Sequence, residues 1–140
     1  QWTPKPLNDV FDFFSDVKNL EELTPPLLNF RVVGKSTENI QEGTKIDYKL
    51  KIRGVPAKWT SLITNWQPMT QFADVQLKGP YAKWHHLHLF RSLAGGVLLE
   101  DKVVYRLPFS RFGGNFLHWF IRKDVKTIFS YRRKRIKEWC

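Results

Sequence analysis

A chain of 140 residues that is 42% hydrophobic and 15% aromatic has the size of one domain with one hydrophobic core. Its net charge of +10 favours polyanions and anionic membrane surfaces as partners, while no segment reaches the ~18 uninterrupted apolar residues of a membrane span. The single cysteine, Cys140, excludes an internal disulfide and fits a reducing compartment, so we expect a cytoplasmic protein.

Two short helices are expected near the N-terminus. In residues 4–16, PKPLNDVFDFFSD, apolar side chains recur at helical spacing behind Pro6, which suits a first helical turn. In residues 16–26, DVKNLEELTPP, the same spacing continues until Pro25-Pro26 stops it.

The period then changes to that of strands. Residues 44–54, TKIDYKLKIRG, place Ile46, Tyr48, Leu50 and Ile52 on one face and charged side chains on the other, which is typical of an antiparallel strand with one wet face. Similar segments separated by turns containing Gly or Pro predict about six or seven strands in a meander; they cover residues 30–36, 44–54, 58–68, 71–79, 81–90 and 96–109.

The last segment, residues 115–139, returns to helical spacing. One stripe holds Leu117, Ile121, Val125, Ile128 and Ile136, with Arg132 interrupting it. A curled sheet must cover its apolar face, and this long helix is the only element large enough to do so. The predicted class is α+β, with a curved antiparallel sheet wrapped around the C-terminal helix.

This order of elements resembles the SRPBCC superfamily of helix-grip proteins, which includes START lipid-transfer domains, birch-pollen-allergen-type proteins and polyketide cyclases. The resemblance is carried by VFDFFSDVKNLEELTPP, EGTKIDYKLKIRGVPAKW, FADVQLKGPYAKWHHLHLF and DKVVYRLPF, and it is closest to small bacterial ligand-binding members of unassigned function. It implies that residues 1–140 form one ligand-binding domain, that Gln1-Trp2-Thr3 are the remainder of a truncated first strand, and that an apolar ligand lies between sheet and helix.

Three of the four histidines lie in one predicted strand, residues 81–90. Strand alternation places Trp84, His86, His88 and Phe90 on one face, which we take to be the inner face because it is aromatic and lacks lysine. In the next strand the same alternation turns Asp101 inward. A four-residue loop, Ser92 to Gly95, would set His86 opposite Asp101; a shift that keeps the faces would set His88 there instead.

The preceding strand is ambiguous. A two-residue Gly79-Pro80 turn would face Ala73, Val75 and Leu77 inward, whereas a three-residue loop through Tyr81 would turn Asp74 and Gln76 inward instead, because one residue of register reverses the face. Apolarity favours the first arrangement and the resemblance favours the second.

Three roles compete for His86, His88 and Asp101: a satisfied buried network that orients a ligand, acid–base catalysis, and metal binding. The first is favoured, so we expect binding rather than catalysis, with no metal and no cofactor. The predicted site is an apolar wall with a polar floor, made of Tyr48, Leu50, Trp59, Trp84, His86, His88, Phe90, Asp101, Val103, Tyr105, Ile121 and Val125.

An enzyme of cyclase, dehydratase or hydrolase type using the same floor is the alternative. A second alternative is a polyanion or membrane-surface protein that uses the basic segment Arg132–Lys137. No nucleic-acid motif accompanies this charge, and cations suit a helix C-terminus, so a solvated helix end is favoured and no specific nucleic-acid partner is expected. The sequence leaves the ligand and the oligomeric state open.

Overall fold

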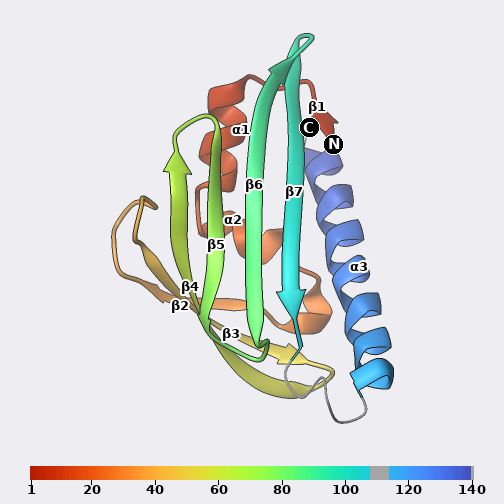
Figure 1. The fold of residues 1–140 in the computed structure, drawn as a ribbon. Helices are drawn as coiled ribbons and strands as arrows, with labels where there is room; N and C mark the ends of the chain where they lie inside the picture. Colours follow the sequence, from red (N-terminus) through yellow and green to blue (C-terminus); the bar gives the residue numbers. More distant parts are fainter. Residues whose placement is uncertain (108–113, 140) are drawn as a thin grey trace.

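The computed structural model describes the backbone of residues 1–107 and 114–139 and the side chains of residues 1–107 and 119–139. Seven antiparallel strands form one curved sheet in the order β1-β7-β6-β5-β4-β3-β2, and the long helix α3 runs beside β7 (Figure 1). The chain order is β1 (Trp2–Thr3), α1 (Leu7–Phe14), α2 (Lys18–Glu22), the 3₁₀ helix η1 (Pro26–Leu28), β2 (Arg31–Lys35), β3 (Lys45–Ile52), β4 (Val55–Gln67), β5 (Gln71–Lys78), β6 (Lys83–Leu93), β7 (Gly96–Arg106) and α3 (Gly114–Trp139).

This architecture confirms the predicted helix-grip α+β fold. The alternation in β3 is confirmed as well, since Ile46, Tyr48 and Leu50 are buried and the charged side chains between them are exposed. The short strand β1 pairs with β7, with Thr3 opposite Val97. None of the helices in the described part of the chain is long and apolar enough to span a membrane.

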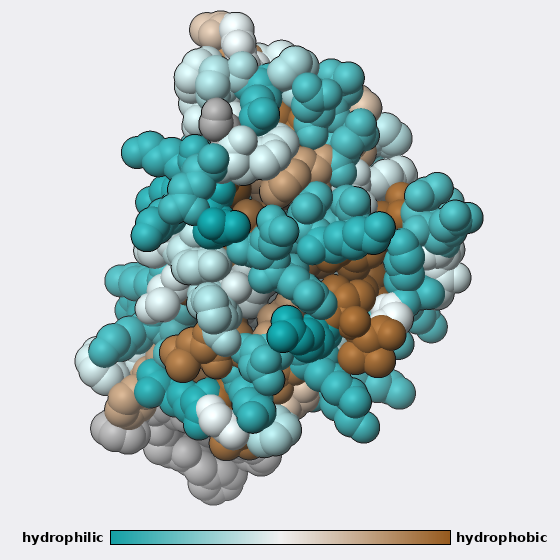
Figure 2. Space-filling view, turned by 180° about the vertical axis from the view of Figure 1, so that it is seen from behind, coloured by the Kyte–Doolittle hydropathy of each residue, from teal (hydrophilic) through white to brown (hydrophobic). Residues whose placement is uncertain are grey.

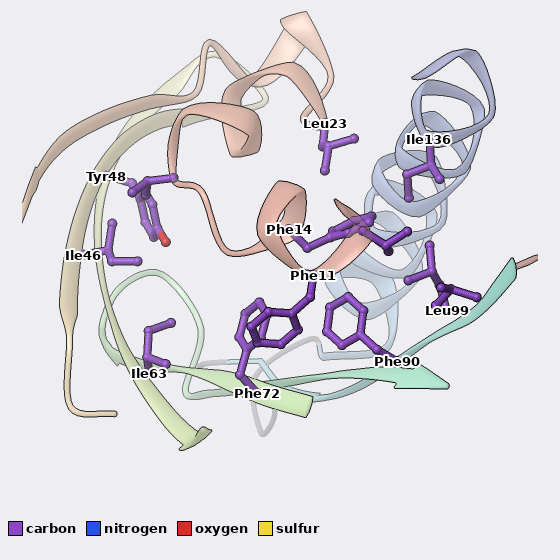
Figure 3. Packing of buried hydrophobic residues seen from close by; sticks show 13 residues of the cluster. Phe11, Phe14, Leu23, Ile46, Tyr48, Ile63, Phe72, Phe90, Leu99 and Ile136 are labelled. Atoms are coloured by element: carbon purple, nitrogen blue, oxygen red, sulfur yellow. The ribbon is translucent and has the colours of Figure 1, made fainter. Parts of the chain in front are cut away.

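An aromatic cluster fixes α1 to the sheet. The ring of Phe11 lies 5.1 Å from that of Phe90 and 6.0 Å from that of Phe72 (Figure 3). It also lies 5.4 Å from the ring of Trp66. Burial of such a side chain contributes about 1.5–3 kcal/mol, and edge-to-face ring pairs add to this. This cluster therefore holds α1 against the inner face of β5 and β6.

The hairpin between β6 and β7 is tighter than the predicted loop. Leu93 pairs with Gly96, so only Ala94 and Gly95 form the turn, with φ angles of 43° and 78°. A two-residue turn with both φ angles positive matches the right-handed twist of the strands. The four-residue loop was wrong, and the alternative register is the observed one, with His88 opposite Asp101 and His86 opposite Val103.

Helix α3 is attached to the rest of the protein at separated points. Near its C-terminus, Trp139 stacks on Phe13 with ring centres 4.1 Å apart. Closer to the start of its described side chains, Asp124 accepts hydrogen bonds of 2.9 and 3.1 Å from Arg53 in the β3–β4 turn. Ile121, Val125 and Ile128 are half-buried and Ile136 is buried, while the predicted stripe residue Leu117 lies outside the described side chains.

Candidate functional site

Three neighbouring strands and α3 bring five polar side chains together, which we call the polar cluster: Asp74 of β5, His86 and His88 of β6, Asp101 of β7 and Arg132 of α3. The register sets Asp74 opposite His86 and His88 opposite Asp101. This pairing places the same residues inward as a three-residue β5–β6 loop would. Asp74 therefore lies on the inner face of the sheet with the two imidazoles. The sequence left this question open, and the structure resolves it.

Each imidazole has a carboxylate partner at 2.9 Å. Nε2 of His86 lies 2.9 Å from Oδ1 of Asp101, and Nε2 of His88 lies 2.9 Å from Oδ2 of Asp74. The second nitrogens are close to the opposite carboxylates, with Nδ1 of His86 3.6 Å from Oδ2 of Asp74 and Nδ1 of His88 3.5 Å from Oδ1 of Asp101. The two rings lie close together, with centres 3.8 Å apart and planes tilted by 32°.

Arg132 completes the cluster from the helix. Its Nε donates to Oδ2 of Asp101 at 3.3 Å, and its Nη2 donates to Oδ1 of Asp101 at 3.4 Å and lies 3.3 Å from Nδ1 of His88. Its guanidinium carbon also sits 4.9 Å over the ring of Phe14. Arg132 is only 7% exposed, so it continues the buried face of α3 instead of interrupting it. It also does not belong to the solvated basic end of the helix, as the sequence had suggested.

The cluster shifts the pKa of each group according to its surroundings. Burial and the neighbouring His88 lower the pKa of His86 to about 4, although its hydrogen bond to Asp101 acts in the opposite direction. Burial also opposes protonation of His88, but its hydrogen bonds with Asp101 and Asp74 outweigh burial and raise its pKa. The pKa of Asp101 is low despite burial, chiefly because of Arg132, and the pKa of Asp74 is low despite burial because of the imidazoles. The two imidazoles therefore differ in how readily they take up a proton, and His88 is the more basic of the pair.

Aromatic rings hold both imidazoles in place. Phe72 stacks on His88 with ring centres 4.4 Å apart and planes 23° from parallel. Phe129 of α3 meets His86 edge to face at 5.3 Å. With both histidines nearly fully buried, their side chains have little freedom to turn.

One cavity, which we call the inner cavity, has a volume of about 150 Å³ and lies on one side of the polar cluster. Its wall is mostly apolar and comes from α2, η1, β3, β4, β6 and α3, and its floor contains Asp74, His86, His88 and Arg132. Trp59 and Trp84 meet edge to face at 5.4 Å in this wall. Burial, then the nearby Asp74, raises the pKa of Tyr48, so its hydroxyl stays a neutral hydrogen-bonding group.

A second space of about 630 Å³, which we call the β7–α3 pocket, lies on the other side of the cluster. It is lined by both apolar and charged side chains, and it shares only His88, Phe129 and Arg132 with the inner cavity. The polar cluster is thus a partition between two spaces rather than the floor of one.

The predicted site residues are divided by this partition. Six of them line the inner cavity: Tyr48, Leu50, Trp59, Trp84, His86 and His88. The β7–α3 pocket contains Phe90, Asp101, Val103, Tyr105 and Val125, together with His88. Ile121 lines neither space and faces an apolar groove beside the β3–β4 turn, with Val55 and Phe120.

Gln76 has a structural contact instead of a place in the inner cavity. Its Nε2 donates to the carbonyl of Tyr81 at 2.7 Å, and its Oε1 accepts from the N–H of Tyr81 at 3.1 Å. The Gln76 side chain therefore holds the β5–β6 connection together and positions Tyr81. The ring of Tyr81 packs against Trp59 and Trp84 in the wall of the inner cavity.

Sequence reasoning missed Arg132 and Phe129 as site residues. The signal for Arg132 was present, because it falls on the apolar stripe where a solvated cation would not be expected. The other basic side chains of the C-terminal segment do meet solvent, since Arg133, Lys134 and Lys137 are exposed and Arg135 pairs with Glu138 at 2.7 Å. Hydrophilic side chains likewise cover most of the face seen from behind (Figure 2).

Asp74, His86 and His88 can also offer three donor atoms, all within 4.8 Å of one another. The sequence suggested Asp101 as the partner of the histidines in a metal site, whereas this group contains Asp74. Cys140 lies outside the described residues.

Comparison with known proteins gives a family and a fold. The family model described as polyketide cyclase / dehydrase and lipid transport matches residues 3–129. No curated protein matches the chain. Among solved structures, TTHA0849 from Thermus thermophilus superposes with a TM-score of 0.71 at 15% identity, covering 99% of this chain and 94% of that one.

Two other solved structures are similar. A START superfamily protein from Mycobacterium smegmatis gives a TM-score of 0.72 at 9% identity, with 100% of this chain and 95% of that chain covered. A nucleoside-diphosphate sugar epimerase from Corynebacterium glutamicum gives 0.68 at 24% identity and covers 99% of this chain, which spans only 27% of the epimerase. At these identities the likeness is one of fold.

Proposed function

Because the chain belongs to the polyketide cyclase / dehydrase and lipid transport family, we propose that residues 1–140 act as a ligand-binding domain for a small, largely apolar molecule in the inner cavity. The observation that carries this proposal is an apolar wall, which includes Tyr48, Trp59 and Trp84, ending on a buried polar cluster. Apolar walls with a few convergent polar groups are typical of ligand sites, in which the polar groups fix orientation.

The form of the cavity favours a compact aromatic or polyketide-like ring over a long acyl chain. Its volume of about 150 Å³ is small beside the roughly 300–1,000 Å³ of common ligand pockets. The edge-to-face pair of Trp59 and Trp84 offers flat apolar surface to a ring. A carbonyl or hydroxyl on that ring would meet His86 and Asp74 at the floor.

A fluorescent apolar probe tests the location of the site. Ile128 of α3 lines the inner cavity, and its neighbour Thr127 is exposed on the same helix. We expect Ile128→Trp to weaken binding of 2-naphthol, a compact fluorescent ring with one hydroxyl, at least ~10-fold by filling the cavity, while the matched Thr127→Trp binds like wild type. Equal binding by the two variants would place the ligand elsewhere.

Native mass spectrometry addresses the identity of the ligand. Protein purified without ligand removal is expected to carry a small molecule that Ile128→Trp does not retain. Such a molecule would identify the chemical class directly.

Catalysis by the polar cluster at the floor of the inner cavity is the second candidate function, and one observation favours it. His88 lies between Asp74 and Asp101, whose hydrogen bonds raise its pKa, so it is the imidazole suited to exchange a proton with a cavity-bound ligand. In a cyclase or dehydratase, Asp101→Asn would reduce kcat far more than ligand affinity, whereas in a binding protein affinity alone would change.

The exposed basic side chains of α3 support only weak anion binding. Arg133, Lys134 and Lys137 are solvated, and of these three only Arg133 lines a pocket in the described part of the chain. Binding to DNA or anionic vesicles is expected to disappear at physiological salt. We propose the cytoplasm as the location, supported by the single cysteine of the sequence.

A further inference from the structure

We propose that Asp74, His86 and His88 bind one divalent transition-metal ion of the zinc class at the floor of the inner cavity. This goes beyond binding of an apolar ligand, and it replaces the sequence expectation of a site without metal. The three side chains are held by adjacent strands, two of them on the same face of β6, so the backbone ladder fixes their relative positions.

The donor atoms have the spacing that a metal requires. Oδ2 of Asp74 lies 2.9 Å from Nε2 of His88 and 3.6 Å from Nδ1 of His86. When two ligand atoms each lie about 2.1 Å from an ion, they are roughly 3.0–3.4 Å from each other. This range covers ligand–metal–ligand angles from the square-planar to the tetrahedral value. Both separations from Asp74 lie within a few tenths of an ångström of this range, and all three donor atoms lie within 4.8 Å of one another, so an ion would replace the hydrogen now shared by His88 and Asp74.

Asp74 rather than Asp101 is the carboxylate free to take the ion. Asp101 is engaged by the guanidinium of Arg132 through both of its oxygens, at 3.3 and 3.4 Å. Within the described residues, the polar contacts found for Asp74 are with the two imidazoles alone. A cation near Asp101 would compete with Arg132, whereas the position beside Asp74 is on the far side of the imidazoles from that contact.

Asp101 then has the role of an outer partner for His86. Its Oδ1 lies 2.9 Å from Nε2 of His86, the nitrogen that would not bind the ion, whereas Nδ1 of His88 has Nη2 of Arg132 at 3.3 Å and Oδ1 of Asp101 at 3.5 Å. Histidine ligands of metals nearly always donate their other N–H to a carboxylate or carbonyl, which fixes ring orientation and raises ligand basicity. Phe72 and Phe129 hold the ring planes in addition.

The donor set and the surroundings indicate the class of ion. Two imidazole nitrogens and one carboxylate oxygen suit Zn²⁺, Co²⁺ or Fe²⁺ better than Mg²⁺ or Ca²⁺, which prefer oxygen ligands. All three ligands line the inner cavity, so a further coordination position would open toward the space proposed for the ligand. Three protein ligands with an open position are typical of sites where a metal contacts water or substrate.

Cobalt provides a direct test in protein stripped with a chelator and carrying Cys140→Ser, which removes the only thiol. Co²⁺ is expected to bind 1:1, with visible d–d absorption of a low-coordinate site, and Zn²⁺ to displace it. In NMR spectra the ring signals of His86 and His88 should be strongly shifted by bound Co²⁺. His85, on the other face of the same strand, should be affected far less and is the internal control.

Three variants separate the roles of the carboxylates. Asp74→Asn should weaken Zn²⁺ binding by calorimetry at least ~100-fold, and Asp101→Asn by ~10–100-fold as an outer partner. Asp47→Asn is the matched control, because Asp47 accepts a hydrogen bond from Thr60 on the outer face of β3. It should bind the ion like wild type.

Absence of 1:1 binding in the wild type, or binding that Asp74→Asn leaves intact, would overturn the metal site. So would Co²⁺ shifts no larger for His86 and His88 than for His85, a result that needs no variant to fold. Binding of 2-naphthol is measured in the same chelated protein. Probe binding without metal binding therefore rejects this inference and leaves the proposed ligand function standing.

Discussion

Arg132 carries its charge into the interior of the protein, where Asp101 and the ring of Phe14 receive it. Replacement by leucine would leave Asp101 without its cation and the cluster with an excess of negative charge. The Asp101 side chain is still 28% exposed, so solvent limits the penalty. We expect Arg132→Leu to lower the free energy of unfolding by ~1–3 kcal/mol in urea denaturation.

The adjacent Arg133 provides the control for that prediction. It is exposed and its side chain has no carboxylate partner among the described residues. Arg133→Leu should change stability by less than ~0.5 kcal/mol. Equal effects of the two substitutions would mean that position 132 behaves as a solvated charge.

The histidines should titrate far apart in the metal-free protein. His86 is expected to stay neutral until the pH falls to about 4, because burial and the neighbouring His88 oppose its charge. His88 should hold its proton to a higher pH than an ordinary histidine, because Asp101 and Asp74 accept its hydrogen bonds. NMR titration of the ring signals checks this, with the outer-face residue His85 as reference. Coincident titration of His86 and His88 would contradict the arrangement.

At the residue scale, sequence patterns located the histidines better than their partners. Alternation along β6 placed His86 and His88 inward correctly, because strand parity depends only on local geometry. Asp74 could not be assigned, since its face depends on one residue of loop length. Arg132 was assigned to solvent by its type, although its position on the apolar stripe indicated the opposite.

At the scale of elements, the β6–β7 turn shows how local chemistry sets which residues meet. Ala94 has φ of 43°, a left-handed conformation that alanine adopts at a cost of about 1–2 kcal/mol. Asparagine tolerates this region, and Asn-Gly is the preferred pair for such turns. We expect Ala94→Asn to raise the free energy of unfolding by ~0.5–1 kcal/mol, measured by urea denaturation.

The neighbouring Gly95 gives the opposite result. Its φ of 78° disfavours any side chain, so Gly95→Ala should be destabilising even though space is open around it. If Ala94→Asn were also destabilising, the turn would not have two left-handed residues.

This turn also explains why the predicted register was off by one pair. Ser92 and Leu93 resemble loop residues in composition, but they continue the ladder opposite Val97 and Gly96. The Ala-Gly pair is a weaker signal than Asn-Gly for a two-residue turn. Because both registers keep the same faces, the error changed the partner of Asp101 and left the inward set intact.

At the scale of the whole molecule, the fold was predictable and the division of its interior was not. Periodicity along the chain gave the order of helices and strands, and residues 44–54 alone showed which face of the sheet is wet. Whether the inner face encloses one space or two depends on Arg132 reaching Asp101 across the gap between α3 and β7. No local pattern encodes a contact between residues 31 positions apart in different elements.

The polar cluster should also shape the pH dependence of the stability of the whole protein. Asp74 and Asp101 have pKa values lowered in the folded state, so their stabilisation is present above their ordinary pKa of 3.8 and is lost as the pH falls below it. The lowered pKa of His86 acts the same way between 6.5 and about 4, since the unfolded chain binds that proton first. The raised pKa of His88 has the opposite sign, giving stability below 6.5 that is lost as the pH rises through its folded value.

The two histidines therefore act in adjoining pH ranges, His88 above 6.5 and His86 between 6.5 and about 4, and the carboxylates add to the loss of stability in stronger acid. We expect urea unfolding of the metal-free protein to show its greatest stability near pH 6.5, with a decline as the pH rises above this value and a steeper decline as it falls toward 4. The net charge of +10 grows as carboxylates are protonated, so self-repulsion should deepen the fall at low salt. The double variant Asp74→Asn, Asp101→Asn should be less stable at pH 7 and should lose less stability on acidification than wild type. If both proteins lost the same amount of stability in acid, the loss would have to come from carboxylates outside the cluster.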